Sequence, residues 1–196
     1  MSLNLYIKEH FTHSIEVKEK ILKNENLLLL IEKVALECVK AYKQGNKTLL
    51  AGNGGSAADA QHLAGEFVSR FYFDRPGIAS IALTTDTSIL TAIGNDYGYE
   101  KVFARQVQAQ GVKGDIFIGI STSGNSLNIL EALKICKEKG IVSVGFTGES
   151  GGKMAELCDY CIKVPSKETP RIQESHILIG HILCAIVEET LFGKGF

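Results

Sequence analysis

The chain has 196 residues, of which 22% are charged, and its formal net charge is −1 at pH 7. This near-neutral balance excludes the basic footprint that nucleic acid or an anionic membrane surface requires. Uninterrupted apolar runs such as Leu27 to Ile31 are too short to span a bilayer, and the first residues do not have the pattern of a secretory signal. We therefore expect a cytoplasmic, soluble protein of one domain, without a nucleic acid or membrane partner.

Apolar residues recur at helical spacing from Ile7 to Leu22 and again from about Asn26 to Gln44, where Gly45 ends the second stretch. Two helices ahead of the first strand present more apolar surface than one layer on a sheet needs. We therefore expect residues 1–45 to pack on the domain and also on a neighbouring subunit.

After Lys47 the pattern changes to short apolar runs that alternate with helical stretches. The expected strands span residues 48–51, 78–83, 115–120, 141–146 and 160–164. The expected helices span residues 56–70, 88–93, 100–110, 126–139, 152–157 and 171–192. This alternation predicts an α/β fold with a mostly parallel sheet covered on both faces. Ligands of such folds bind beyond the carboxyl ends of the strands.

The first glycine-rich loop runs from Gly52 to Ala57 and opens the first helix after the first strand. Its G-x-G-x-x-A spacing fits the dinucleotide fingerprint, with Asp74 at about the right distance. However, Asp74 lies in a loop signal before Pro76, whereas the ribose-binding acid should end the second strand. We therefore expect no nucleotide, but a tight turn that presents backbone N–H groups and Asn53 to a smaller ligand.

The helix after this loop carries polar side chains at spacings of three and four residues, namely Asp59, His62, Glu66 and Arg70. His62 and Glu66 share one face of the helix. A solvated helix face would have the same pattern. We favour a functional face because it begins one turn from the loop.

The second glycine-rich loop, Gly119 to Ser126, follows an apolar run and carries four hydroxyl residues, Ser121, Thr122, Ser123 and Ser126. Short hydroxyl side chains donate to phosphate oxygens, and the helix that begins near Ser126 directs its unpaired N–H groups and positive dipole end at an anion. An ordinary N-cap and turn is the alternative. We interpret the loop as a phosphate site.

A third polar stretch, Gly94 to Gly98, contains Asn95 and Asp96. Asn and Asp tolerate unusual backbone angles, so an ordinary turn explains the composition. Hydrogen bonds to sugar hydroxyls are the functional interpretation, and the sequence leaves both open.

The last helix is apolar almost all round in its second half, which predicts burial, and His181 lies in that half. A hydrogen-bonded core histidine is the alternative to a functional one. Gln173 lies two turns earlier and within about a quarter turn of His181, so both side chains can face one ligand. His176 points away from His181 and has no assigned role.

Five cysteines, an odd number, do not make a disulfide framework. Cys158 and Cys161 form a C-x-x-C pair, but no second pair accompanies it. We interpret this pair as apolar packing rather than as zinc or redox chemistry.

Taken together, the two glycine-rich loops resemble those of the sugar isomerase, or SIS, domain. The resemblance extends to the phosphoheptose isomerase family through Gly94-Asn95-Asp96, Thr147-Gly148, Gly151-Gly152-Lys153-Met154 and Arg171-Ile172-Gln173-Glu174. It implies a single SIS domain over residues 1–196. The implied fold is a flavodoxin-like three-layer αβα sandwich with a five-stranded sheet and an N-terminal helical extension. It also implies a homotetramer with active sites between subunits.

The resemblance implies an aldose–ketose isomerase that converts D-sedoheptulose 7-phosphate to D-glycero-D-manno-heptose 7-phosphate through an enediol. This reaction leads toward ADP-heptose and the core of lipopolysaccharide. The alternative is a non-catalytic SIS tetramer that binds the replication initiator DnaA. That relative lacks the residues that match Glu66 and His181, and their presence here favours the enzyme.

Residue roles follow from the resemblance position by position. The phosphate ligands would be Ser121, Thr122, Ser123 and Ser126, and the sugar contacts would be Asn53, Gly54, Gly55, Ser56, Glu66, Asn95, Asp96 and Gln173. Glu66 would be the base and His181 its acid partner. Some members bind zinc through residues that match His62, Glu66, Gln173 and His181. Many members have Asp where this chain has Pro170, so no role is carried over to this position.

Overall fold

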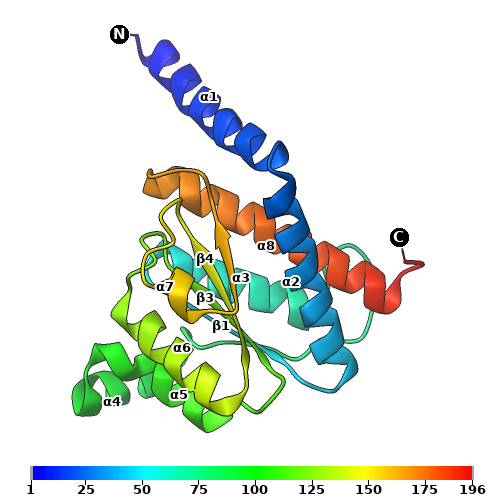
Figure 1. Cartoon of the computed structure of the whole chain (residues 1–196), viewed down its shortest axis with the longest axis vertical. Coiled ribbons are helices and arrows are strands. Elements are labelled where there is room, and N and C mark those ends of the chain that lie inside the picture. Colours follow the sequence, from blue (N-terminus) through cyan, green and yellow to red (C-terminus); the bar gives the residue numbers. More distant parts are fainter. Residues whose placement is uncertain (1, 196) are drawn as a thin grey trace.

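Five parallel strands form the centre of the computed structural model, which describes residues 2–195 (Figure 1). The strands are β1 (Thr48–Gly52), β2 (Ser80–Ala82), β3 (Ile116–Ile120), β4 (Val142–Thr147) and β5 (Tyr160–Lys163). Their spatial order is β2-β1-β3-β4-β5, and every neighbouring pair is parallel. This is the flavodoxin order, in which connections diverge between β1 and β3. The predicted fold class is therefore confirmed.

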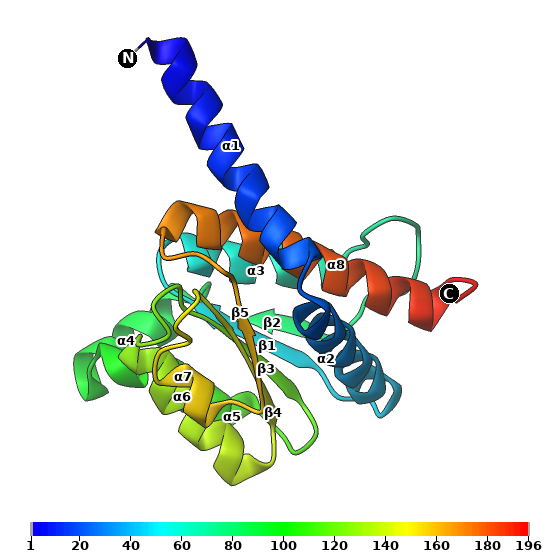
Figure 2. The same cartoon turned by 45° about the horizontal axis from the view of Figure 1, so that its top comes forward.

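Helices cover both faces of the sheet (Figure 2). One layer consists of α2 (Glu25–Lys43), α3 (Gly55–Val68) and α8 (Thr169–Phe192). The other layer contains α4 (Thr87–Tyr97), the 3-10 helix η1 (Tyr99–Lys101), α5 (Val102–Gln110), α6 (Leu127–Lys139) and α7 (Met154–Leu157). The chain therefore has the three layers expected of an αβα sandwich.

Two apolar clusters lie on opposite sides of the sheet. Phe67 and Ile179 belong to the cluster under α2, α3 and α8, and Phe103 and Leu133 belong to the cluster under α5 and α6. Every residue of β1 and β3 is buried. Their continuous apolar runs are typical of parallel strands covered on both faces. The first cluster holds α3 and α8 side by side, which positions most of the candidate site.

The first helix, α1 (Leu3–Leu22), projects from the rest of the chain (Figures 1 and 2). Only Val17 and Ile21 are buried in it, whereas Leu3 and Phe11 are 82% and 68% exposed. The second helix packs on the domain as expected. The contact with a neighbouring subunit stays a prediction, and both ends of the predicted domain, residues 1 and 196, lie outside the described residues.

The helix α8 differs from its prediction in burial. It is long and apolar enough to cross a bilayer by length and composition, with a mean hydropathy of 1.4 in its most apolar window. In this fold it packs against α2 and α3, which accounts for its apolar composition. Leu178 and Ile182 remain 39% and 40% exposed. The expected burial of the second half therefore holds at Ile179, Leu183 and Cys184 but not at Ile182.

The five cysteines are free thiols. Cys38, Cys136 and Cys184 are buried, whereas Cys158 and Cys161 are half-buried beside Gly145. Burial and the Cys161 thiol raise the pKa of Cys158. The Cys158 thiol lowers the pKa of Cys161 to about 6.

Candidate active site

The first loop turns sharply from β1 into α3. Gly54 adopts φ +56°, and a Cβ on Gly52 would overlap the carbonyl oxygen of Ser56, so both positions need glycine. Asn53 points toward α6, where its amide exchanges two hydrogen bonds with Asn128, at 3.0 and 2.8 Å. Asn128 is buried, and no sequence motif indicates it as a site residue. The pair ties the first loop to the helix that follows the second loop.

The second loop brings three of its predicted phosphate ligands together. The Ser121 hydroxyl lies 2.8 Å from the Ser126 hydroxyl and 3.5 Å from that of Ser123. Gly124 has φ +67°, and a Cβ there would overlap the carbonyl oxygen of Gly151. The hydroxyls therefore converge at the N-terminus of α6, where unpaired N–H groups and the dipole favour an anion.

Thr122 fixes the loop through its backbone, because its carbonyl oxygen accepts a hydrogen bond from Gly148 N at 3.0 Å. The Asn125 side chain accepts from Lys153 N at 3.1 Å. These contacts connect the loop to the segment before α7. The hydroxyls are thus presented on a backbone that is held from outside the loop.

An open cavity of about 570 Å³ lies between the two loops. Its lining consists of Asn53, Tyr99, Glu100, Ser126, Leu127 and Asn128. The cavity therefore lies beside Ser126, one of the predicted phosphate ligands, and has the concave form of a small-molecule site.

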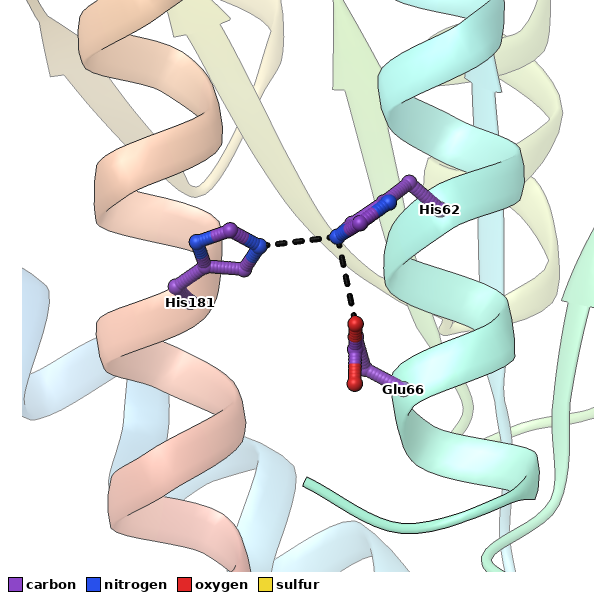
Figure 3. Close-up of side chains that lie close together, drawn as sticks. All are labelled: His62, Glu66 and His181. Carbon is purple, nitrogen blue, oxygen red and sulfur yellow. Dashed lines mark hydrogen bonds and ion pairs between the residues drawn. The ribbon is translucent and has the colours of Figure 1, made fainter. Parts of the chain in front are cut away.

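Three side chains converge between α3 and α8 (Figure 3). His62 and Glu66 lie one turn apart on α3, with His62 Nε2 3.2 Å from Glu66 Oε1. His181 reaches across from α8, and its Nε2 lies 2.8 Å from His62 Nε2. The i,i+4 spacing in α3 and the packing of α8 beside it produce this arrangement. We call these three residues the His–Glu–His cluster.

The His–Glu–His cluster fits a metal ion by its donor set. Its three ligand atoms all lie within 4.8 Å of one another. Two imidazoles and a carboxylate are a common ligand set of catalytic zinc, which keeps a further position open. Two ring nitrogens bound to one tetrahedral zinc ion, at about 2.0–2.1 Å each, would lie roughly 3.3 Å apart. The distance between the two Nε2 atoms, now 2.8 Å, would therefore need to increase only slightly.

Gln173 lies beside the first loop. Its amide nitrogen would be 2.7 Å from a Cβ on Gly55, at the start of α3. By helical rise the backbone of His62 lies about 10 Å further along α3. The part of Gln173 in a metal site stays a prediction.

Asn95 and Asp96 lie at the exposed end of α4, where Asn95 Nδ2 donates to Asp96 Oδ1 at 2.8 Å. The expectation of a loop from Gly94 is wrong, because α4 continues to Tyr97. Neither side chain lines the cavity of this chain. A contact between these residues and the sugar stays a prediction.

His176 is the fully buried histidine of α8. Its Nε2 donates to the carbonyl oxygen of Thr147 at 3.1 Å, and its Nδ1 has no partner. Burial lowers the pKa of His176 to about 4, against the opposing effect of the Thr147 hydrogen bond. The sequence offered a hydrogen-bonded core histidine as the alternative interpretation of His181. In the structure it is His176 that has this environment.

A parallel sheet in the flavodoxin order, with two glycine-rich loops at the carboxyl ends of β1 and β3, defines a class of α/β proteins that bind ligands at this edge of the sheet. The chain belongs to the SIS domain family, whose model matches residues 10–148. It is 80% identical over 195 residues to phosphoheptose isomerase 2 of Campylobacter jejuni. The aligned residues cover 100% of this chain and 97% of the relative. It is 73% identical to the phosphoheptose isomerase of Aneurinibacillus thermoaerophilus, over 99% of this chain and 98% of the relative.

Solved structures agree with these relatives. The phosphoheptose isomerase of Neisseria gonorrhoeae superimposes with a TM-score of 0.90 at 42% identity, over 96% of this chain and 100% of that one. The phosphoheptose isomerase of Francisella tularensis gives a TM-score of 0.92 at 36% identity with the same coverage. The family suggested by the sequence motifs is therefore confirmed.

Proposed function

We propose that this chain is an aldose–ketose isomerase that interconverts D-sedoheptulose 7-phosphate and D-glycero-D-manno-heptose 7-phosphate. The observation that carries the proposal is the convergence of Glu66 and His181 from neighbouring helices. The 80% identity with a phosphoheptose isomerase supports the choice of substrate. We place the reaction in the cytoplasm, at the start of the route to ADP-heptose and lipopolysaccharide.

In this proposal the second loop, Gly119 to Ser126, which we call the serine loop, anchors the substrate. The hydroxyls of Ser121, Ser123 and Ser126, with Thr122, bind the phosphate at the N-terminus of α6. The sugar then extends through the cavity past Asn53 toward α3, with Gln173 beside it. Since α3 begins at the first loop, the carbon chain is directed along it to the reacting groups.

Glu66 and His181 carry the proton transfer. Isomerisation moves a proton between C1 and C2 through an enediol, which needs a base near carbon and a donor near oxygen. A carboxylate and an imidazole supply these functions. His181 packs against the Phe71 ring, with centroids 5.5 Å apart, and this contact limits the orientations of the imidazole.

We further propose that zinc binds at His62, Glu66 and His181, with Gln173 turning from Gly55 to join them. When bound, zinc polarises the substrate carbonyl and stabilises negative charge on oxygen. A carboxylate that ligates zinc is a weaker base. The metal content of the active protein therefore bears directly on the role of Glu66.

A homotetramer with active sites between subunits accounts for the exposed apolar surface. Leu3 and Phe11 on α1 and Ile182 on α8 are largely uncovered in the single chain. Exposed apolar surface of this extent is typical of subunit interfaces. In this arrangement Asn95 and Asp96 would contact sugar at a site shared with a neighbour.

The direct test is an assay of the purified protein with D-sedoheptulose 7-phosphate, followed by NMR of the anomeric protons. We expect Glu66→Gln and His181→Ala to abolish turnover while circular dichroism remains native. Glu37→Gln, on α2, is the matched control and should retain full activity. A wild-type protein that binds the sugar phosphate without turnover would contradict the proposal and favour a binding role such as the DnaA alternative.

Zinc is tested separately by elemental analysis of protein purified without chelator. We expect about one zinc ion per proposed site and loss of activity after exhaustive EDTA treatment. Full activity of the metal-free protein would remove zinc from the mechanism.

A further inference from the structure

A buried ion pair links the segment after α3 to α8. Arg75 Nε lies 3.0 Å from Glu188 Oε1, and the two side chains are only 2% and 1% exposed. Arg75 belongs to a stretch that the sequence predicts only as a loop, and Glu188 lies two turns beyond His181 on α8. Burying two charges is costly compared with apolar packing, so this pair calls for an explanation beyond stability.

The Arg75 guanidinium holds the C-terminal end of α3. Its Nη2 donates to the Glu66 carbonyl oxygen at 2.8 Å, and its Nη1 donates to those of Phe67 at 2.7 Å and Ser69 at 3.1 Å. The last carbonyls of a helix lack partners within the helix, and a cation there also opposes the negative dipole end. Arg75 therefore fixes the backbone of Glu66 itself.

The Glu188 carboxylate holds the segment that borders His181. Its Oε1 accepts from Phe71 N at 2.8 Å and its Oε2 from Tyr72 N at 2.6 Å. The Phe71 ring packs against the His181 ring. Burial alone would raise the pKa of Glu188, but these backbone donors and Arg75 lower it overall, so the carboxylate is ionised near neutral pH.

The two helices approach closely at one further point. A Cβ on Gly180 would lie 2.6 Å from the Leu63 side chain, so α8 and α3 nearly touch beside His181 and His62. This contact and the apolar cluster around it have no directional bonds. The hydrogen bonds of Arg75 and Glu188 add a directional connection beyond Glu66.

We propose that Arg75 and Glu188 form a positioning pair that sets the separation and orientation of Glu66 and His181. The inference rests on the proposed roles of those two residues. Within the described residues, the polar contacts of the pair go to backbone groups and to each other, not to the side chains of the His–Glu–His cluster. It acts through the α3 backbone and through Phe71.

The test compares Glu188→Gln with Asp115→Asn in the full-length protein. Asp115 is a matched control, because it is also a buried carboxylate that pairs with a cation, Lys47. It also accepts hydrogen bonds from two backbone N–H groups, those of Lys47 at 3.1 Å and Val112 at 2.9 Å. It precedes β3, at the opposite end of the sheet from the ligand loops. Both variants should lower the midpoint of urea unfolding.

Only Glu188→Gln should disturb catalysis. We expect kcat to fall about 10- to 100-fold, as for an error of about 1 Å in placing reacting groups. KM should stay within about twofold, since the serine loop is unchanged. Arg75→Lys keeps the charge but loses the fork of donors, and it should give the same kcat loss if Glu188→Gln does not fold.

The second readout does not depend on activity. Side-chain ¹H–¹⁵N spectra should show shifted imidazole signals of His62 and His181 in Glu188→Gln and unshifted ones in Asp115→Asn. If kcat falls equally in both variants, or if the imidazole signals do not move, the pair is merely structural and the inference is wrong. An inactive wild-type protein would refute the proposed function, while the imidazole signals would still decide the positioning role.

Discussion

Replacing Ser121 by alanine should separate substrate anchoring from chemistry. Ser121 is 3% exposed, and its backbone N–H donates to the Phe146 carbonyl oxygen at 3.0 Å, independently of the side chain. The substitution therefore removes the hydroxyl and leaves the loop backbone held. Since the hydroxyl lies 2.8 Å from that of Ser126, its loss also leaves Ser126 with one partner fewer.

The magnitude follows from the charge of the ligand. A hydrogen bond to a charged group contributes about 1.5–3 kcal/mol, so KM or Kd should rise about 10- to 150-fold. The free energy of unfolding should fall by only about 1 kcal/mol, the usual contribution of a neutral hydrogen bond. For a chain of this size that lowers Tm by roughly 2–4 °C.

Ser143→Ala provides the matched control. Ser143 is also 3% exposed, and its hydroxyl donates to Asp159 Oδ2 at 2.8 Å near the amino end of β4. Because its partner is a carboxylate, this variant should lose at least as much stability as Ser121→Ala, while KM stays unchanged.

The assay measures kcat and KM with D-sedoheptulose 7-phosphate, together with the inhibition constant of inorganic phosphate. We expect Ser121→Ala to weaken both substrate and phosphate binding with little change in kcat. A fall in kcat with intact KM and intact phosphate inhibition would refute the assignment of this loop to anchoring.

Two further substitutions test the loop backbone and the core. Gly124→Ala should lower the free energy of unfolding in urea by more than about 1–2 kcal/mol, because φ is +67° and the new Cβ would overlap Gly151. Gly65→Ala is the control: it lies on the open surface of α3, so it should be neutral or stabilising. His176 has a pKa lowered to about 4 and stays neutral when folded, whereas the unfolded chain binds a proton below about pH 6.5. The free energy of unfolding should therefore fall by about 3 kcal/mol through this residue as the pH drops from about 6.5 to 4. His176→Gln should flatten this part of the plot of stability against pH. An unchanged slope would contradict the neutral, buried state of His176.

Much of the fold could be predicted because parallel strands and amphipathic helices have distinct periodicities. The stretch from Gly94 shows where composition failed. Asp86 Oδ1 caps α4 by accepting from Ile89 N at 2.9 Å, and the helix continues until Gly98 at φ +87°. Turn-forming residues were thus incorporated into a helix whose ends are fixed elsewhere.

The candidate site was predictable to the extent that its residues are local. His62 and Glu66 share a face through their i,i+4 spacing, which a sequence reveals directly. Asn128 was missed because its partner Asn53 lies 75 residues away in the chain. Arg75 was missed because Glu188 lies 113 residues away, and no periodic pattern connects positions brought together only by tertiary packing.

The helix α3 connects the first loop, the His–Glu–His cluster and the Arg75–Glu188 pair. It begins at the first loop, beside the predicted phosphate site, carries His62 and Glu66 along one face, and ends where Arg75 binds its last carbonyls. A helix of this length is about 20 Å of stiff backbone. The first loop, tied to α6 by the Asn53–Asn128 pair, and a buried ion pair at the last turn therefore locate the same carboxylate from both ends of the helix. Remote binding energy can then be used to orient the reacting carbons, which is how a phosphate far from C1 and C2 contributes to the rate.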